Sequence, residues 1–294
     1  MEIIMYQVDA FSDEIFGGNP AGVIPNNNNL NERTMQKIAR ELNLSETAFI
    51  EKIEEDKYNV RFFTPTNEVD LCGHATIASF YTLAIKGYIK GMKNGVKRVY
   101  QQTRVGELYV DIYYKEDNVD KIMMEQSKPK KIKNIRDYKE LSEALNIEER
   151  HIGIEDKNIN PEIISTGLPD IILPIKNKYM LDNIKINKNK VAQLSKKLDV
   201  TGIHLFTIED GEIYTRNFAP LVGIDEEAAT GTANGALFYY LRENKLIQKN
   251  SIISHQGEAL KRPSEIICKL SNYNSSVIEV GGSAKIVIEG VIQC

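Results

Sequence analysis

Two stretches of this 294-residue chain carry the same motifs in the same order, and this repeat limits the possible folds more than any other feature. The motif R-x-F-x-P occurs at residues 61–65 and again at residues 216–220. A run of small and apolar residues that begins with glycine follows each copy, at 73–84 and 231–241. The order of the blocks predicts two copies of one fold.

Each copy has the pattern of a mixed α and β unit. An amphipathic helix is predicted at 31–42, because apolar side chains recur on one helical face, and Val191, Leu194 and Leu198 repeat this pattern in the second copy. The glycine-led helices are apolar around most of their circumference, so each should be buried within its own copy. Runs rich in Val, Ile, Tyr and Phe predict strands. We therefore predict an α+β fold of two pseudo-symmetric domains, each a sheet around a central helix, with the second beginning near residue 117.

Composition and charge exclude several classes of function. Hydrophobic residues form 42% of the chain and the net charge is −4, so the chain is globular and lacks the basic excess that nucleic acid binding requires. Three cysteines are too few for a disulfide framework, which favours a cytoplasmic location. The N-terminus has no basic leader, and the apolar stretch at 228–241 is too short for a bilayer, so no membrane association is expected. The four histidines have no second ligand at a useful spacing, so no metal site is expected.

The starts of the glycine-led helices are candidate anion sites. The first turn of a helix exposes backbone N–H groups, and small residues let an anion approach them closely. Gly73 and His74 stand at one start, and Gly231 and Thr232 stand at the other. Tight packing of helix against strand is the alternative reason for glycine at these positions, but two equivalent starts favour a site for a carboxylate.

The two copies differ at one position that matters for chemistry. Glu46 follows the first amphipathic helix, whereas Gly202 stands at the matching position of the second copy, which offers no carboxylate there. Next to the apolar residues 48–50, a carboxyl group should have a raised pKa and could transfer protons. Glu46 is therefore a candidate general acid and base.

Several motifs together resemble those of the PhzF-like isomerases, a family named for phenazine biosynthesis within the diaminopimelate epimerase fold. The resemblance covers nearly the whole chain. The motifs are FGGNPAGV at 16–23, LSETAF at 44–49, RFFTP at 61–65, DLCGHAT at 70–76, RNFAP at 216–220 and ATGTA at 229–233.

The resemblance implies a fold, an activity and an assembly. It implies a diaminopimelate epimerase-like architecture, with a barrel-like sheet around a central helix in each domain and the active site between the domains. The C-terminal strand is expected to return to the first domain, so the predicted domains are 1–116 with 278–294, and 117–277. The activity implied is that of a cofactor-independent isomerase, in which one glutamate moves a proton between carbon atoms of a small carboxylated metabolite. A homodimer is also implied.

The resemblance also assigns roles to individual residues. Glu46 matches the proton-carrying glutamate and His74 the histidine of the glycine-histidine motif. Glu227 stands where an aspartate is usual, and the proline that normally follows is Ala228, so a reshaped pocket and a different substrate are expected. The substrate-binding segments place contacts on Asn19, Ser45, Gly73, Gly231 and Thr232.

Two alternative functions stay open. Racemases and epimerases of this fold use paired thiols, and Cys72 occupies the first thiol position. Thr230 occupies the second, which disfavours that mechanism and makes Cys72 a small packing residue near the site. A catalytically silent protein of the same fold that binds small acids is the other alternative, and the substrate itself stays open.

Overall fold

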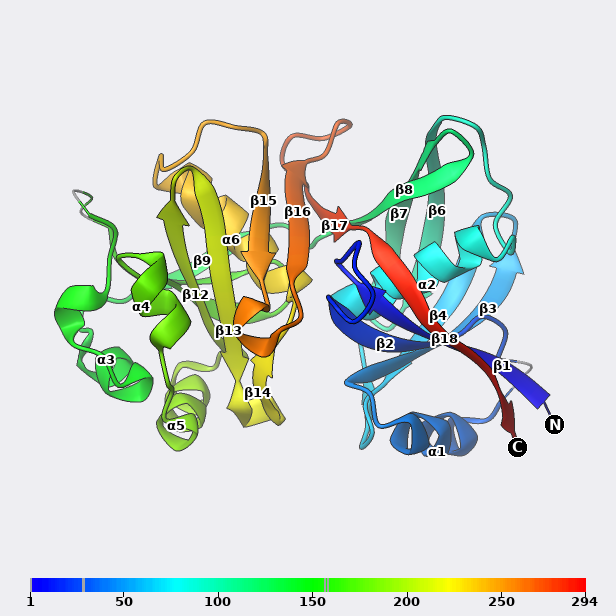
Figure 1. Cartoon of the computed structure of the whole chain (residues 1–294), viewed down its shortest axis with the longest axis horizontal. Coiled ribbons are helices and arrows are strands. Elements are labelled where there is room, and N and C mark those ends of the chain that lie inside the picture. The colour runs from blue at the N-terminus through cyan, green and yellow to red at the C-terminus, as the bar shows by residue number, and fades with distance from the viewer. Residues whose placement is uncertain (1, 28–29, 156, 158) are drawn as a thin grey trace. The chain divides into compact units, whose positions relative to one another are not determined.

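The computed structural model describes residues 2–27, 30–155, 157 and 159–294 (Figure 1). The chain divides into two compact units: unit 1 is Met1–Glu125 with Gly281–Cys294, and unit 2 is Gln126–Val280. The predicted boundary near residue 117 falls instead in the turn of a hairpin between β7 (Gly106–Lys115) and β8 (Asn118–Glu125). The hairpin stays whole because β8 packs on the central helix of unit 1. At the other end, the change of unit lies within β17 (Ile278–Gly282), three residues later than predicted.

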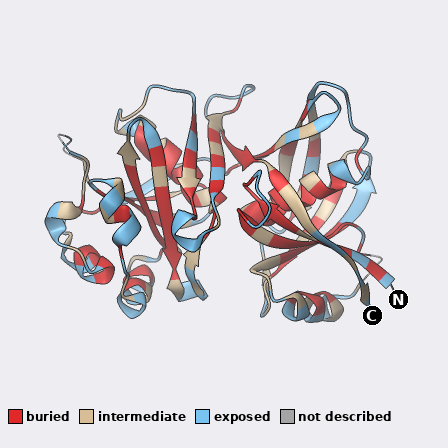
Figure 2. Cartoon of the chain, in the orientation of Figure 1, coloured by how far each residue is buried: buried red, intermediate tan, exposed pale blue. Residues whose placement is uncertain are grey.

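Unit 1 is a curled sheet around the helix α2 (Gly73–Ile85). The helix contacts strands on several sides of it, which is the predicted burial, and its apolar residues Ile77, Ala78 and Phe80 are fully buried (Figure 2). The strands pair in the order β18–β1–β2–β3–β4–β6–β7–β8; the pairs β2–β3 and β4–β6 are parallel and the others antiparallel. The other strand bounds are β1 (Glu2–Ala10), β2 (Asn19–Ile24), β3 (Glu46–Glu54), β4 (Lys57–Phe63), β5 (Glu68–Val69, paired with β4), β6 (Gly95–Thr103) and β18 (Ala284–Gln293).

The amphipathic helix α1 (Glu32–Leu42) covers the outer face of this sheet. Its N-cap Asn31 accepts a hydrogen bond from the Thr34 N–H at 3.0 Å, which satisfies one of the unpaired donors of the first turn. Its buried face packs with Phe49 and Phe63. The helix ends at Leu42, and the left-handed backbone of its C-cap residue Asn43 (φ 51°) turns the chain toward β3.

Unit 2 repeats this connectivity. Its strands pair in the order β9–β10–β11–β12–β13–β15–β16, with β11–β12 and β13–β15 parallel, as β2–β3 and β4–β6 are in unit 1. The central helix is α6 (Gly231–Glu243), and α5 (Lys188–Leu198) corresponds to α1. The remaining elements are β9 (Lys130–Asn134), β10 (Glu162–Ser165), β11 (Pro169–Pro174), β12 (Gly202–Glu209), β13 (Glu212–Ala219), β14 (Ile224–Glu227, paired with β13), β15 (Ser251–Gln256), β16 (Ser264–Leu270), α3 (Lys139–Leu145) and α4 (Lys178–Asn183). The predicted repeat and the α+β class are confirmed.

The repeated R-x-F-x-P motif has a structural role that its sequence did not disclose. Arg61 donates two hydrogen bonds to the Glu68 carboxylate, at 2.7 and 2.6 Å, and Arg216 donates two to Glu226, at 2.8 and 2.9 Å. Each guanidinium also lies over the phenylalanine two residues later in its motif. In both units this bidentate ion pair holds the short strand that precedes the central helix, which is β5 in unit 1 and β14 in unit 2, against the strand that carries the arginine.

No helix in the described part of the chain is both long and apolar enough to cross a membrane.

We expect the two arginines to contribute unequally to stability. The side chains of Arg216 and Glu226 are 10% and 12% exposed, and Arg216 also donates to the Leu181 and Ile184 carbonyls. Arg216→Met should therefore lower the free energy of unfolding by about 3–5 kcal/mol, the usual effect of leaving a buried charge without its partner. Urea unfolding followed by circular dichroism measures this.

Arg61→Met is the matched control. Glu68 keeps an ion pair with Arg104 in that variant, so the loss should be clearly smaller than for Arg216→Met. Equal losses in the two variants would contradict the role assigned to Arg104 as the remaining partner of Glu68.

Candidate active site

Glu46 is the first residue of β3, at a rim of the unit 1 sheet. The left-handed turn at Asn43 ends α1 and brings the chain directly into this strand. Parallel pairing of β2 with β3 sets Glu46 opposite Ala21. Its side chain is 13% exposed and is followed along the strand by the fully buried Ala48 and Phe49. The carboxyl group thus lies between an apolar interior and the surface.

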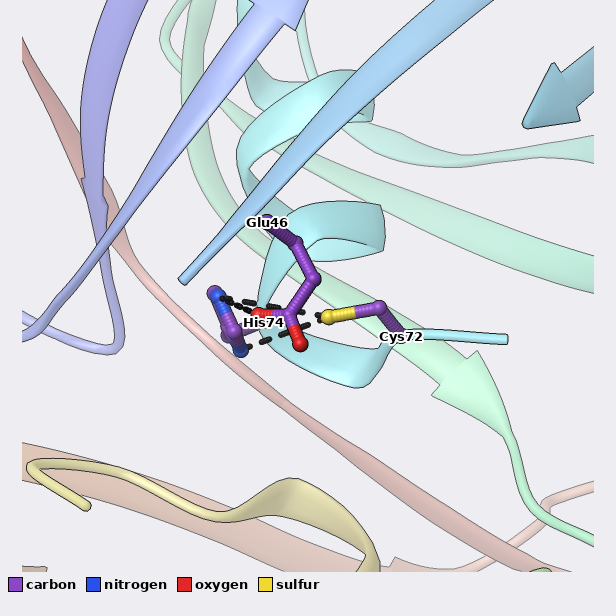
Figure 3. Close-up of side chains that lie close together, drawn as sticks. All are labelled: Glu46, Cys72 and His74. Atoms are coloured by element: carbon purple, nitrogen blue, oxygen red, sulfur yellow. Dashed lines mark hydrogen bonds and ion pairs between the residues drawn. The ribbon is translucent and has the colours of Figure 1, made fainter. Parts of the chain in front are cut away.

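His74, the second residue of α2, lies directly against this carboxyl group (Figure 3). Its Nε2 is 3.1 Å from Glu46 Oε2 and 3.2 Å from Ser45 Oγ, and its Nδ1 is 3.4 Å from Cys72 Sγ. The imidazole is 4% exposed. Four side chains that the sequence places in two segments, 45–46 and 72–74, therefore form one cluster where α2 begins.

The cluster holds Glu46 as a carboxylate, contrary to the expected raised pKa. Burial alone raises the pKa of Glu46, but the charge of His74 and hydrogen bonds from His74, Ser45 and Cys72 outweigh it and leave the pKa below its ordinary value. Burial lowers the pKa of His74, and its contacts with Cys72 and Glu46 raise it by more, to well above its ordinary value. The resting pair is a carboxylate beside an imidazolium, a charge pattern that position in the sequence alone could not indicate.

Cys72 was predicted to be a small packing residue, but its sulfur is part of the polar cluster and contacts His74. Burial and the neighbouring charge of Glu46 raise the pKa of the Cys72 thiol to about 11, against the lowering effect of His74. At neutral pH the sulfur is therefore a thiol, which can donate a hydrogen bond but is a poor base.

The same three residues form a possible metal-binding group, so the expectation that no histidine has a nearby ligand was wrong. Ligand atoms of Glu46, Cys72 and His74 all lie within 4.8 Å of one another. Oxygen, sulfur and nitrogen donors of this kind suit zinc. Binding would require a thiolate and a neutral imidazole, however, whereas the electrostatics of the cluster favour the thiol and the imidazolium.

The other predicted substrate contacts in unit 1 lie next to the cluster. Gly73 is the first residue of α2, and a Cβ there would meet only Met124 Sδ, at 3.9 Å. Asn19 is the first residue of β2 and is buried; the next residue, Pro20, presents its carbonyl 3.4 Å from Ser45 Oγ.

The predicted residues of unit 2 gather where α6 begins. Gly231 and Thr232 are its first two residues, and Thr230 is the N-cap residue. Glu227, at the end of β14, accepts a hydrogen bond from Thr230 Oγ1 at 2.6 Å. Thr230, which stands where a second thiol would be required, therefore uses its hydroxyl to hold this carboxylate.

The absence of a side chain at Gly202 has a packing cause. A Cβ there would lie 2.3 Å from the Phe218 carbonyl oxygen, so only glycine fits. The second copy nevertheless carries a buried carboxyl group on the adjacent strand, because Asp170 of β11 pairs with Gly202. The sequence comparison of the two copies missed Asp170, since it considered only residues at matching positions.

Known proteins resemble this chain over nearly its whole length. Residues 8–290 match the model of the PhzC-PhzF family, described as phenazine biosynthesis-like protein. An uncharacterized isomerase of Clostridium acetobutylicum is 40% identical, covering 97% of this chain and 96% of that protein. A crystal structure of a Bacillus anthracis phenazine biosynthesis protein of the PhzF family covers 100% of both chains with a TM-score of 0.86 and 25% identity.

A more distant structure supports the architecture alone. A hydroxyproline epimerase from Agrobacterium vitis shares 10% identity with a TM-score of 0.63, covering 99% of this chain and 91% of that one. Together the structural neighbours confirm the predicted diaminopimelate epimerase-like fold.

The protonation states in the cluster predict how it responds to zinc. Added Zn²⁺ must displace protons from Cys72 and His74, so its affinity should be weak at pH 6 and should increase as the pH rises to 8. Isothermal titration calorimetry measures the affinity at each pH.

Cys72→Ala should weaken zinc binding, while Cys268→Ala, which removes another buried thiol, should leave it unchanged. Equal affinity in the Cys72→Ala variant and the native protein would contradict the assignment of these ligands.

Proposed function

Because this chain belongs to the phenazine biosynthesis-like PhzC-PhzF family and is an isomerase, we propose that Glu46 is the group that moves the proton during isomerisation. The observation that carries the proposal is the pairing of Glu46 with His74 at the start of α2, at 3.1 Å. The substrate class we propose is a small carboxylated molecule with an acidic C–H bond.

The lowered pKa of Glu46 makes it a base in the resting protein. Its carboxylate takes a proton from a substrate carbon, so the C–H bond breaks, an O–H bond forms and the electron pair stays on the substrate. Glu46 is then neutral, and the positive charge of His74 beside it can stabilise the negative charge that has moved to the substrate. Glu46 returns the proton to a second carbon, which restores the carboxylate and shifts the double bond without oxidation or reduction. General acid and base catalysis of this kind contributes roughly 10²–10⁴-fold in rate.

The start of α2 offers a place for the substrate carboxylate. Among the described residues, the space beside Gly73, the first residue of α2, is open apart from the Met124 sulfur. Backbone N–H groups at a helix N-terminus favour an anion there. We assign Gly73 and Ser45 to substrate binding on this basis, whereas contacts from Asn19, Gly231, Thr232 and Glu227 stay predictions from the family resemblance.

The burial of the thiol argues against the racemase alternative. A base with a pKa of about 11 is mostly protonated at neutral pH, whereas Glu46 is already ionised. A protein that only binds small acids does not require a buried carboxylate that an adjacent imidazolium keeps ionised, so the binding-protein alternative is also weaker.

Glu46→Gln should slow proton transfer strongly. The amide keeps the shape of the side chain but cannot accept the proton, so the rate should fall roughly 10²–10⁴-fold. A panel of small carboxylic and amino acids is incubated with the protein in heavy water, and deuterium incorporation is followed by NMR.

Glu51→Gln is the matched control, because Glu51 is exposed on the same strand. Full exchange by the Glu46→Gln variant would refute the proposal. Exchange at an amino-acid α-carbon that is lost in Cys72→Ser would support the racemase alternative instead.

The rate should depend on pH through the paired charges. Because the pKa of Glu46 is lowered, kcat/KM should fall only when the pH drops below the ordinary range of a glutamate; at high pH it should fall as His74 loses its proton, well above the ordinary histidine range.

In His74→Asn, burial of Glu46 is no longer opposed by a positive charge, so the acidic limb should move to higher pH. An acidic limb that stays in place would show that His74 does not control Glu46.

A further inference from the structure

A groove runs along one side of α1, the helix on the outer face of the unit 1 sheet (Figure 1). Residues of α1 form one wall, and the other wall contains Phe63 of β4, Glu68 of β5 and Arg104 of the turn between β6 and β7. The volume of the groove is about 710 Å³, which is in the usual range of small-molecule sites. None of the described residues that line it belongs to the Glu46 cluster or to the predicted substrate contacts. The groove is therefore a candidate for a second binding site.

Three basic residues of α1, namely Arg33, Lys37 and Arg40, line this groove and are termed the α1 cations. Spacings of four and then three residues place them on one side of the helix. With a rise of about 1.5 Å per residue, they extend over roughly 10 Å of the helix axis. All three residues are exposed. The helix thus presents a short row of positive charge to the groove.

The carboxylates of the groove already have arginine partners. Glu68 accepts two hydrogen bonds from Arg61 and also pairs with Arg104. Glu32 lies 2.7 Å from the same Arg61 guanidinium. In the described part of the chain, by contrast, none of the α1 cations forms an ion pair or a side-chain hydrogen bond. Like charges at these spacings repel one another, and a bound anion would offset that repulsion.

Contacts between the walls hold the groove in shape. The Gln36 side chain donates a hydrogen bond to the Thr64 carbonyl at 2.8 Å, which ties α1 to the end of β4. Arg61 bridges Glu32 of α1 and Glu68 of β5, which ties the same helix to the opposite wall. A ligand would therefore meet a site whose backbone is already ordered, and little binding free energy would be lost in forming it.

We propose that this groove binds a short, linear oligophosphate through the α1 cations. An arginine binds phosphate oxygens through two parallel N–H groups, and a lysine binds them as a point charge. A row of cations about one helical turn apart fits negative groups that follow one another along a chain better than it fits one compact anion.

The surroundings of the row limit what can bind. Glu32 precedes the α1 cations in the helix and Glu41 follows them, so a long polyanion such as a nucleic acid would meet negative charge beyond both ends. The aromatic ring among the described lining residues is that of Phe63, which is 1% exposed and has the Arg61 guanidinium over it at 5.2 Å. That ring is not available for stacking on a nucleobase, so the phosphate chain alone should carry the affinity.

The test is isothermal titration calorimetry of the full chain with inorganic tripolyphosphate, at low ionic strength and without divalent cations, because salt screens exposed charges. The native protein should bind it, and Lys37→Gln/Arg40→Gln should bind it roughly tenfold more weakly. Glutamine is nearly as good a helix former as lysine or arginine, and both positions are exposed, so the fold should be kept. Circular dichroism checks this.

Lys52→Gln/Lys115→Gln is the matched control. Both lysines are exposed in unit 1, lie outside the groove and form no ion pair with a described residue, so this variant loses the same net charge and should bind as the native protein does. Inorganic phosphate should bind clearly more weakly than tripolyphosphate, and ATP should bind no more tightly.

Four results would overturn the proposal: no binding of tripolyphosphate, equal affinity in the native protein and Lys37→Gln/Arg40→Gln, an equal loss in the control variant, or phosphate binding as tightly as tripolyphosphate. ATP binding more tightly than tripolyphosphate would contradict recognition of the phosphate chain alone. These measurements follow binding and leave Glu46 unchanged, so their outcome is independent of the proposed function.

Discussion

The burial of two helices that are apolar on nearly all sides is the constraint on which the rest of this structure depends. A helix such as α2 has no polar face to present to water, so the sheet of unit 1 curls around it, and unit 2 does the same around α6. A buried helix still has unpaired N–H groups at its start. In unit 1 this start lies beside Glu46, where β3 begins, so enclosing the helix also assembles an imidazolium, a carboxylate and backbone donors.

The two units share one arrangement of strands and helices but carry different side chains at the paired positions Ala21–Glu46 and Asp170–Gly202. Both use an arginine–glutamate pair to fasten the strand before the central helix, and both repeat the same alternation of parallel and antiparallel pairing. They differ in charge balance. The positive charge of His74 and hydrogen bonds lower the pKa of Glu46, whereas burial and the charge of Glu227 raise the pKa of Asp170 to about 7. The same backbone pattern thus places a carboxyl group with a lowered pKa in one unit and a carboxyl group with a raised pKa in the other.

The repeat made the fold predictable from the sequence, because matched motifs indicate matched elements. The bounds of α1 and α2 agree with the predicted helices to within a few residues, and α5 contains the three apolar positions predicted for the counterpart of α1. The domain boundary was harder to place, since nothing in the sequence near Asp117 distinguishes a turn within a hairpin from a linker. The candidate site could be predicted in part: the sequence led to Glu46 and His74, but the sign of the pKa shift of Glu46 depends on a contact across 28 positions of sequence. Asp170 gave no signal, because its burial beside Gly202 follows from strand register and not from a motif.

The lack of space for a side chain at Gly202 limits which substitutions the second copy of the repeat can accept. No side chain can be added there without displacing the Phe218 backbone, so a single substitution cannot restore a Glu46-like residue to β12. The same pair of residues in unit 1 is less constrained, since Ala21 already carries a Cβ. Substitution can therefore move the carboxyl group between the two paired strands more easily in unit 1 than in unit 2. Once the two halves have become different at this pair, the main-chain packing around Gly202 keeps them different.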